Sequence, residues 1–210
     1  MINVVIDTNV LVATLLTPQG DHAKVLMTVL RNPMAFNLVV SSQIMDEYRD
    51  VCGRSVITLR GLKQEADALI ALVESVAEEI VPKAIPELVY PDEKDKPFLE
   101  AAVYTSGILV SNNTKDYPFA GVRILKAGEF LSFTESKGLG FHLCKAGCQT
   151  EKIPFEIALD TGVSMRDAMA ASERIWKNSV ETGTDEMTPE EIDAEIATSR
   201  AERKMHGTTV

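Results

Sequence analysis

The chain has 210 residues, of which 45% are hydrophobic, and its formal net charge at pH 7 is −10. This length allows one sizeable domain with an appendage or two small domains, and the apolar fraction is sufficient for a core. The acidity argues against broad electrostatic binding of nucleic acid, although clustered carboxylates that hold cations would reverse the charge locally.

The sequence gives no indication of a membrane or secreted protein. It has no run of 18 apolar residues, so we expect no membrane-spanning helix. It begins directly with the apolar residues of a strand, without the basic and apolar regions of a signal peptide. Three cysteines, an odd number without framework spacing, are typical of a reducing compartment. We therefore expect a cytoplasmic protein.

The first stretch predicts a buried strand that ends in a carboxylate. Val4-Val5-Ile6 has the branched apolar residues of a strand buried on both faces, and Asp7 follows at once, before a short apolar helix. Open α/β sheets form their sites at the carboxyl ends of strands, which makes Asp7 a candidate site residue. The alternative is that Asp7 or Thr8 only caps the next helix.

Helical and strand patterns alternate up to about residue 133. We predict helices at 22–31, from Ser41 or Ser42 to Cys52, at 62–80 and from about Pro97 to Val103, a helical turn at 129–131, and strands at 38–40, 108–111 and 122–125. This alternation predicts an α/β domain at 1–133, a doubly wound parallel sheet flanked by helices.

Further polar residues fall at related points of this predicted sheet. Glu47 lies at the margin of an apolar helix face, and Asp95 lies on the buried face at the start of a later helix, where it could also be an N-cap. Asn113 and Asp116 follow the strand at 108–111. In a right-handed doubly wound sheet these points lie on the same edge as Asp7.

An oxygen-only set of this kind favours Mg²⁺ or Mn²⁺ as its ligand. No histidine, cysteine or serine nucleophile accompanies it. Carboxylates with divalent metals suit in-line displacement at phosphorus, where one metal activates water and another stabilises the leaving oxygen.

Four segments, in this order, resemble the PIN-domain nucleases, which include the VapC-like toxins of bacterial toxin–antitoxin pairs. They are Val-Ile-Asp7-Thr8-Asn9-Val-Leu, Val-Ser-Ser-Gln-Ile-Met-Asp-Glu47-Tyr, Asp95 before Phe-Leu-Glu-Ala-Ala, and Leu-Val-Ser-Asn-Asn113-Thr-Lys-Asp116-Tyr-Pro. The resemblance covers about residues 1–132 and implies a PIN-like fold.

The resemblance also implies a metal-dependent endoribonuclease that uses water as nucleophile and leaves 5′-phosphate and 3′-hydroxyl ends. The catalytic residues would be Asp7, Glu47, Asp95 and Asp116, and the ligands of Mg²⁺ or Mn²⁺ would be Asp7, Glu47, Asp95 and Asn113. Thr8, Asn9 and Ser111 are predicted to contact the RNA substrate, and Thr8 could also orient Asp7 or hold a metal-bound water. We expect a homo-oligomer, a dimer, with an antitoxin or the chain's own tail as a protein partner.

Two departures from the family pattern leave other functions open. Asn113 stands where an aspartate is frequent, which would weaken a second metal, and Lys96 stands where many relatives have an acid. The alternative function is a catalytically degenerate PIN-domain protein that binds a partner toxin or antitoxin. A phosphotransferase with an Asp nucleophile is disfavoured, because such enzymes usually have a second Asp where this chain has Asn9.

Residues 134–210 predict a mostly helical, extended C-terminal arm. The segments 152–157 and 190–203 resemble the tails of RelB/DinJ-type antitoxins, without room for their DNA-binding part. In such a tail Arg200 or Arg203 could pair with the carboxylates and displace metal. The alternative is that these arginines pair with Asp193 and Glu195 on the helix surface.

The predicted arm also contains part of a zinc-site pattern. His142, Cys144 and Cys148 lie close together in the sequence, but a structural zinc normally has four ligands. Buried thiols are the better interpretation of these cysteines.

Overall fold

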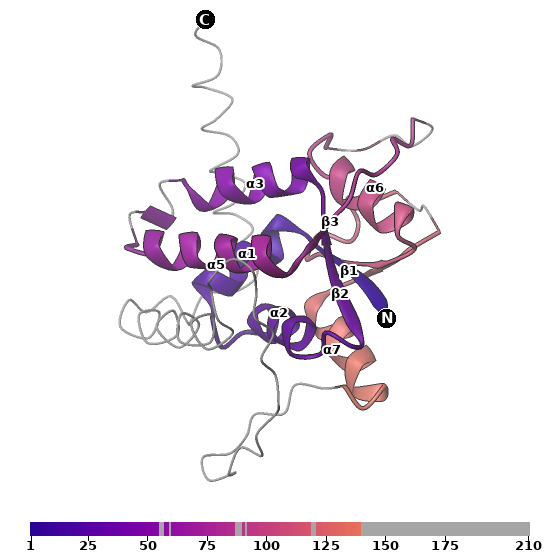
Figure 1. Ribbon diagram of the computed structural model, residues 1–210, viewed down its shortest axis with the longest axis horizontal. Coiled ribbons are helices and arrows are strands. Elements are labelled where there is room, and N and C mark those ends of the chain that lie inside the picture. Colours follow the sequence, from indigo (N-terminus) through magenta and orange to yellow (C-terminus); the bar gives the residue numbers. More distant parts are fainter. Residues whose placement is uncertain (55–56, 59, 87–89, 91, 119–120, 140–210) are drawn as a thin grey trace, which may run out of the picture.

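Figure 1 shows a computed structural model of the chain, which describes residues 1–139 apart from 55–56, 59, 87–89, 91 and 119–120. In chain order its elements are β1 (Ile2–Ile6), α1 (Thr8–Leu16), α2 (Asp21–Arg31), β2 (Phe36–Val40), α3 (Ser42–Cys52), α5 (Lys63–Val76), β3 (Glu78–Glu79), α6 (Lys96–Tyr104), β4 (Ile108–Val110), β5 (Arg123–Leu125) and α7 (Ala127–Ser136). The strands form one sheet in the order β3-β2-β1-β4-β5, and all four pairings are parallel. The predicted α/β class, a parallel sheet flanked by helices, is confirmed.

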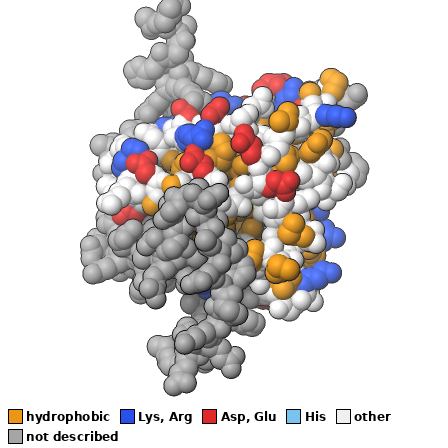
Figure 2. Space-filling model, in the orientation of Figure 1, with side chains coloured by type: hydrophobic (Ala, Val, Ile, Leu, Met, Phe, Trp, Pro, Cys, Tyr) orange, Lys and Arg blue, Asp and Glu red, His pale blue; other side chains and the backbone are white. Residues whose placement is uncertain are grey.

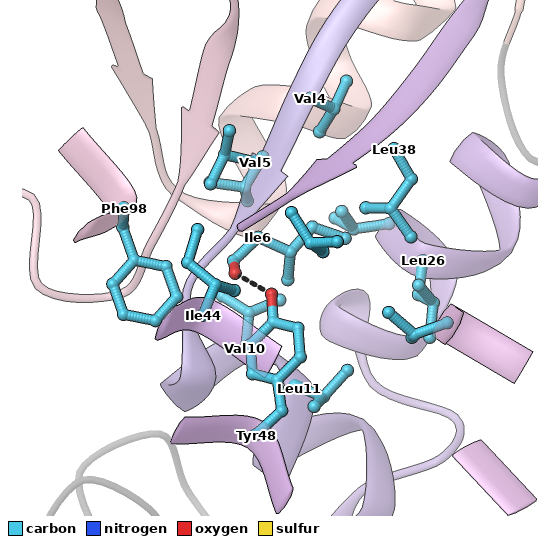
Figure 3. Close-up of a cluster of buried hydrophobic side chains, with 14 of the residues drawn as sticks. Val4, Val5, Ile6, Val10, Leu11, Leu26, Leu38, Ile44, Tyr48 and Phe98 are labelled. Atoms are coloured by element: carbon cyan, nitrogen blue, oxygen red, sulfur yellow. Dashed lines mark hydrogen bonds between the residues drawn. The ribbon is translucent and has the colours of Figure 1, made fainter. Parts of the chain in front are cut away.

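The core is organised around β1 and the helix that follows it. Val4, Val5 and Ile6 are buried, as branched residues of a central parallel strand should be. Every residue of α1 is buried too, which explains why that helix has no polar face. Figure 3 shows side chains from β2, α2, α3 and α6 packed around this centre.

Tyr48 of α3 fixes the end of β1. Its ring is buried beside that of Phe98, with 6.2 Å between the ring centroids. Its hydroxyl donates a hydrogen bond to the carbonyl oxygen of Ile6, drawn as the dashed line in Figure 3. Because Ile6 is the last residue of β1, this bond holds the strand directly before Asp7.

The order of the strands creates a switch point beside β1. The chain moves outward from β1 through β2 to β3, and then returns to place β4 on the other side of β1. Ile6 lies opposite Val110, and the Asp7 amide donates to the Val110 carbonyl oxygen over 2.9 Å. The carboxyl ends of β1 and β4 therefore meet where open α/β sheets have their ligand crevice.

Three elements differ from the sequence-based predictions. The helix predicted at 62–80 ends at Val76, and Glu78–Glu79 forms β3 at the edge of the sheet. The prediction was wrong here because two exposed glutamates have no strand pattern, and backbone pairing with β2 decides their conformation. The helical turn predicted at 129–131 is the longer helix α7, whose Phe130 packs on Phe36.

The predicted division at residue 133 falls inside α7. Leu139 also packs against the core, and its amide donates to the Thr134 carbonyl oxygen over 2.9 Å. The described residues end at Leu139 and so include only the start of the predicted arm. Its antitoxin-like segments and the group His142, Cys144 and Cys148 lie outside the described residues, so the two-domain division stays a prediction. Within the part of the chain that the structure describes, no helix is long and apolar enough to cross a membrane.

Candidate functional site

Asp7 is the centre of a buried polar network at the switch point. Its side chain is 1% exposed, although a carboxylate is costly to bury without partners. Oδ2 accepts hydrogen bonds from Ser111 Oγ at 2.6 Å, Tyr117 Oη at 2.7 Å and Asn9 Nδ2 at 3.0 Å. Oδ1 accepts from the Asn9 amide at 3.2 Å. Neutral donors from α1, the end of β4 and the following loop thus hold one carboxylate.

The predicted capping role of Asp7 is correct as well. Asp7 is the N-cap of α1, and its bond from the Asn9 amide is the capping bond. One side chain therefore starts the helix and occupies the crevice. Thr8 is already inside α1, fully buried, and its Oγ1 has no hydrogen-bond partner among the described residues.

Ser111 connects the end of β4 to this network. Its Oγ donates to Asp7 and accepts from the Asn113 amide at 3.0 Å and from Asn9 Nδ2 at 3.3 Å. The Asn9 Oδ1 atom accepts from the Asn112 amide at 3.2 Å. The side chains of Asn9 and Ser111 are thus occupied in holding Asp7 and the loop after β4, and their predicted contact with substrate stays a prediction.

Tyr117 belongs to the site although the sequence did not identify it. An aromatic residue after a strand-end loop has the pattern of a core side chain, and nothing in the sequence gives the direction of its hydroxyl. Burial raises the pKa of Tyr117 well above its usual value, and the nearby charges of Asp7 and Asp95 raise it further. The phenol therefore stays protonated at neutral pH and acts as a donor.

Asp95 reaches the same centre from the start of α6. It is 5% exposed, and its charge acts on the Tyr117 hydroxyl that also touches Asp7. It occupies the N-cap position, but its backbone is αR and its side chain makes no capping hydrogen bond. Simple N-capping, the alternative for this residue, is therefore excluded.

Glu47 lies on α3, next to Tyr48 in the sequence. It is half-buried, whereas its neighbour Asp46 is exposed, as the predicted margin position requires. Burial raises the pKa of Tyr48 strongly, and the charges of Asp7 and Glu47 add to this effect. The carboxylates of Asp7, Glu47 and Asp95 thus act electrostatically on two buried tyrosines that flank the end of β1.

Asn113 and Asp116 lie in the loop that follows β4. Both are half-buried, and the Asp116 amide donates to the Asn113 carbonyl oxygen over 3.0 Å. This turn brings the chain back so that Tyr117 reaches Asp7. His22 of α2 also contacts this loop through a 2.8 Å hydrogen bond between its Nε2 and Asn112 Oδ1, a contact that the sequence did not suggest.

The donor chemistry fits a hard divalent cation held partly by water. In the described part of the chain, no three carboxylate, histidine or cysteine side chains lie close enough together to hold a metal ion by themselves. Mg²⁺ usually keeps several waters and takes one or two protein carboxylates plus substrate phosphates. Asp7 Oδ1, with one long hydrogen bond, and the unpartnered Thr8 Oγ1 are oxygens that such an arrangement could use.

A cavity of about 430 Å³ lies elsewhere, at the amino ends of β4 and β5. Its lining residues are Val103, Ser106, Gly107, Ile108, Gly121, Val122 and Arg123. It contains no carboxylate and lies at the opposite end of the strands from Asp7. This cavity therefore lacks the carboxylates that the sequence-based prediction requires.

Comparison with protein families gives a match to a large part of the described chain. A family model described as PIN domain matches residues 3–115 of the 210-residue chain, which is more than half of it. The matched range includes Asp7, Glu47, Asp95 and Asn113 and ends before Asp116 and Tyr117. Neither the curated proteins nor the solved structures gave a match. The predicted tail residues Arg200 and Arg203 lie outside both the matched range and the described residues.

Proposed function

Because the chain belongs to the PIN-domain family, whose members are generally nucleases that use divalent metal ions, we propose that it is a Mg²⁺- or Mn²⁺-dependent endoribonuclease. One observation carries this proposal. A buried carboxylate, Asp7, lies at the switch point of a parallel sheet, held by neutral donors, and the charges of Glu47 and Asp95 act on the buried tyrosines Tyr48 and Tyr117 beside it.

Asp7, Glu47 and Asp95 would hold the metal partly through bound water, because the described residues form no three-carboxylate group that holds an ion by itself, and Asn113 would add an amide oxygen. A bound divalent cation would supply an activated water and charge neutralisation at the scissile phosphate. Asp116, in the loop beside Asn113, would assist these carboxylates. The predicted products are a 5′-phosphate and a 3′-hydroxyl.

The acidity of the chain shapes how RNA would be recognised. With a net charge of −10, the protein offers no general attraction for phosphate. RNA binding would then depend on cations at the carboxylate site and on contacts from neighbouring residues, of which Thr8, Asn9 and Ser111 are the candidates. We expect the protein to contact only a short stretch of RNA around the carboxylate site.

The biological role that we propose is that of a toxin in a toxin–antitoxin system. Support comes from the resemblance of the first 132 residues to VapC-like toxins and of the arm to RelB/DinJ-type antitoxin tails. Arg200 or Arg203 would inhibit by pairing with the carboxylates, in the same chain or in the second copy of a dimer.

A catalytically degenerate binding protein is the second candidate. The observation in its favour is that no three-carboxylate metal group is formed by the described residues, together with Asn113 in place of an acid. Titration with Mn²⁺, followed by the midpoint of thermal unfolding, separates the two functions. A nuclease gains stability saturably, because the metal binds only the folded state, whereas a degenerate site gains none.

Cleavage itself is tested with a mixed RNA pool and Mn²⁺. Removal of an outer partner of a metal ligand already costs about 10- to 100-fold in activity, so Asp95→Asn should cost at least about 100-fold. Glu79→Gln is the matched control, since this carboxylate is exposed on the edge strand β3. Equal activity of Asp95→Asn and Glu79→Gln would refute the assignment.

A further inference from the structure

Two buried tyrosines flank Asp7, and their hydroxyls have different partners. Tyr48 donates to a backbone carbonyl, that of Ile6, and so holds the strand. Tyr117 donates to the Asp7 carboxylate itself, over 2.7 Å. Only Tyr117 therefore acts directly on the side chain that the proposed chemistry uses.

The hydrogen bonds divide the two oxygens of Asp7 unequally. A carboxylate oxygen has about two lone-pair sites, and Oδ2 receives three donors, at 2.6, 2.7 and 3.0 Å. Oδ1 receives only the Asn9 amide, at 3.2 Å. The two shortest contacts have the length of hydrogen bonds from a hydroxyl to an ionised oxygen. Oδ2 is therefore fully used inside the protein, and Oδ1 is not.

The direction of these bonds is fixed by the neighbours. Ser111 Oγ accepts from the Asn113 amide and from Asn9 Nδ2, which leaves its single proton for Asp7. Ser111 and Asn9 thus also form hydrogen bonds with groups other than Asp7. Tyr117 comes from the loop that also carries Asn113 and Asp116. Its bond joins that loop to Asp7.

We propose that Tyr117 is a positioning residue, whose hydroxyl, together with the Ser111 hydroxyl and the Asn9 side-chain amide that donate to the same atom, holds Asp7 by Oδ2 so that Asp7 presents Oδ1 alone to a divalent cation. This inference rests on the proposed metal-dependent function. One-oxygen binding suits the octahedral Mg²⁺ and Mn²⁺, whereas Ca²⁺ readily takes both oxygens of a carboxylate. Tyr117 would thereby favour the smaller cations.

The test compares Tyr117→Phe with Tyr48→Phe in the full chain. Each variant loses one hydroxyl from a fully packed ring, and only the first loses a bond to Asp7. Mn²⁺ and Ca²⁺ affinities are measured by calorimetric titration, and the midpoint of urea unfolding gives stability. We expect Tyr117→Phe to bind Mn²⁺ about tenfold more weakly, as is usual when a partner of a metal ligand is removed. Its Ca²⁺ affinity should fall less, so that the ratio of the Ca²⁺ to the Mn²⁺ dissociation constant decreases.

The control variant Tyr48→Phe and the two possible negative results give different measurements. Tyr48→Phe should be destabilised and should leave the ratio of the two dissociation constants unchanged, because its lost bond goes to the Ile6 carbonyl oxygen and to neither oxygen of Asp7. If the two variants have the same Mn²⁺ affinity and the same ratio, Tyr117 is only a core residue and the inference is wrong. If the unmodified chain shows no saturable Mn²⁺ binding, the proposed function fails and this inference fails with it.

Discussion

At the scale of single residues, Asp7 serves both folding and the proposed chemistry. It caps α1, accepts four hydrogen bonds and is almost completely buried. Alanine at this position would therefore cost stability as well as activity, because it would leave several buried donors without an acceptor.

Asp7→Ala and Asp7→Asn should therefore differ in stability while both lack cleavage activity. Each buried donor left unpaired costs roughly 1–3 kcal/mol, so alanine should lower the free energy of unfolding by at least that much. Asparagine keeps one carbonyl oxygen for Ser111 and Tyr117 and should cost less. Urea unfolding of both variants measures the difference. Equal stability of Asp7→Ala and the unmodified chain would show that the network is not formed.

Cys52 illustrates a buried group without a proposed role. Burial, with a contribution from Asp67, raises the pKa of its thiol to about 12. An unfolded thiol has a pKa of about 8.5, so the folded state retains the proton that the unfolded state loses. The contribution of this thiol to the free energy of unfolding is fully present below about pH 8.5 and is lost as the pH rises toward 12.

Native protein at pH 8.5 should consequently leave Cys52 unmodified by iodoacetamide. The same treatment in urea should alkylate it, and peptide mass spectrometry distinguishes Cys52 from the cysteines of the arm. Rapid native alkylation of Cys52 would mean that α3 opens locally or that its thiol is exposed.

At the scale of elements, the turn between α6 and β4 sets how closely β4 approaches β1. Gly107 lies so close to β1 that an added Cβ would be 2.8 Å from the Asn3 carbonyl oxygen. Gly128, in the first turn of α7, would gain a Cβ with only Asp21 Oδ2 nearby, at 3.8 Å. Substitution by alanine is therefore expected to have opposite effects on stability at Gly107 and Gly128.

Gly107→Ala should destabilise the protein by roughly 1–3 kcal/mol, since the backbone must shift to admit the methyl group. Gly128→Ala should stabilise it by about 0.5 kcal/mol, because alanine has less backbone entropy to lose in a helix. Thermal unfolding of both variants is the measurement. A neutral Gly107→Ala would mean that β4 is not held this tightly against β1.

Some of the helices and strands can be predicted from the sequence and others cannot. The strands β1, β2, β4 and β5 and most helices followed from apolar periodicity, because burial on a regular element produces a regular pattern. β3 did not, since Glu78 and Glu79 pair only through their backbone at the sheet edge. The sequence predicts the inward positions of Asp7, Glu47 and Asp95, because strand ends and helix faces are readable from sequence. Tyr117 was missed, because its function depends on where a loop returns.

At the scale of the whole molecule, the described part shows charges of both signs on its surface. Figure 2 shows acidic and basic side chains side by side over α3 and α5, where Arg49 pairs with Asp46 at 2.9 Å and with Glu74 at 2.7 Å. Such exposed pairs contribute little to stability. On the face that Figure 2 draws, the basic side chains over α3 and α5 therefore lie among acidic ones.

The arm is where regulation is proposed. If Arg200 or Arg203 pairs with the carboxylates, the change of both to glutamate should raise Mn²⁺-dependent cleavage by the full chain. Arg31→Glu is the control for the change of charge, because Arg31 is exposed and is the last residue of α2. Unchanged cleavage in the double variant would make these arginines ordinary surface residues.

The most direct test of the central claim is cleavage of a mixed RNA pool in Mn²⁺ by the full chain and by residues 1–139, each with and without Asp7→Asn. The shorter form ends after Leu139 so that α7 and its core contacts stay intact. We predict cleavage by residues 1–139 that Asp7→Asn lowers at least about 100-fold, and slower cleavage by the full chain if the arm inhibits. Absence of cleavage by both folded forms, or cleavage that Asp7→Asn leaves unchanged, would contradict a nuclease centred on Asp7.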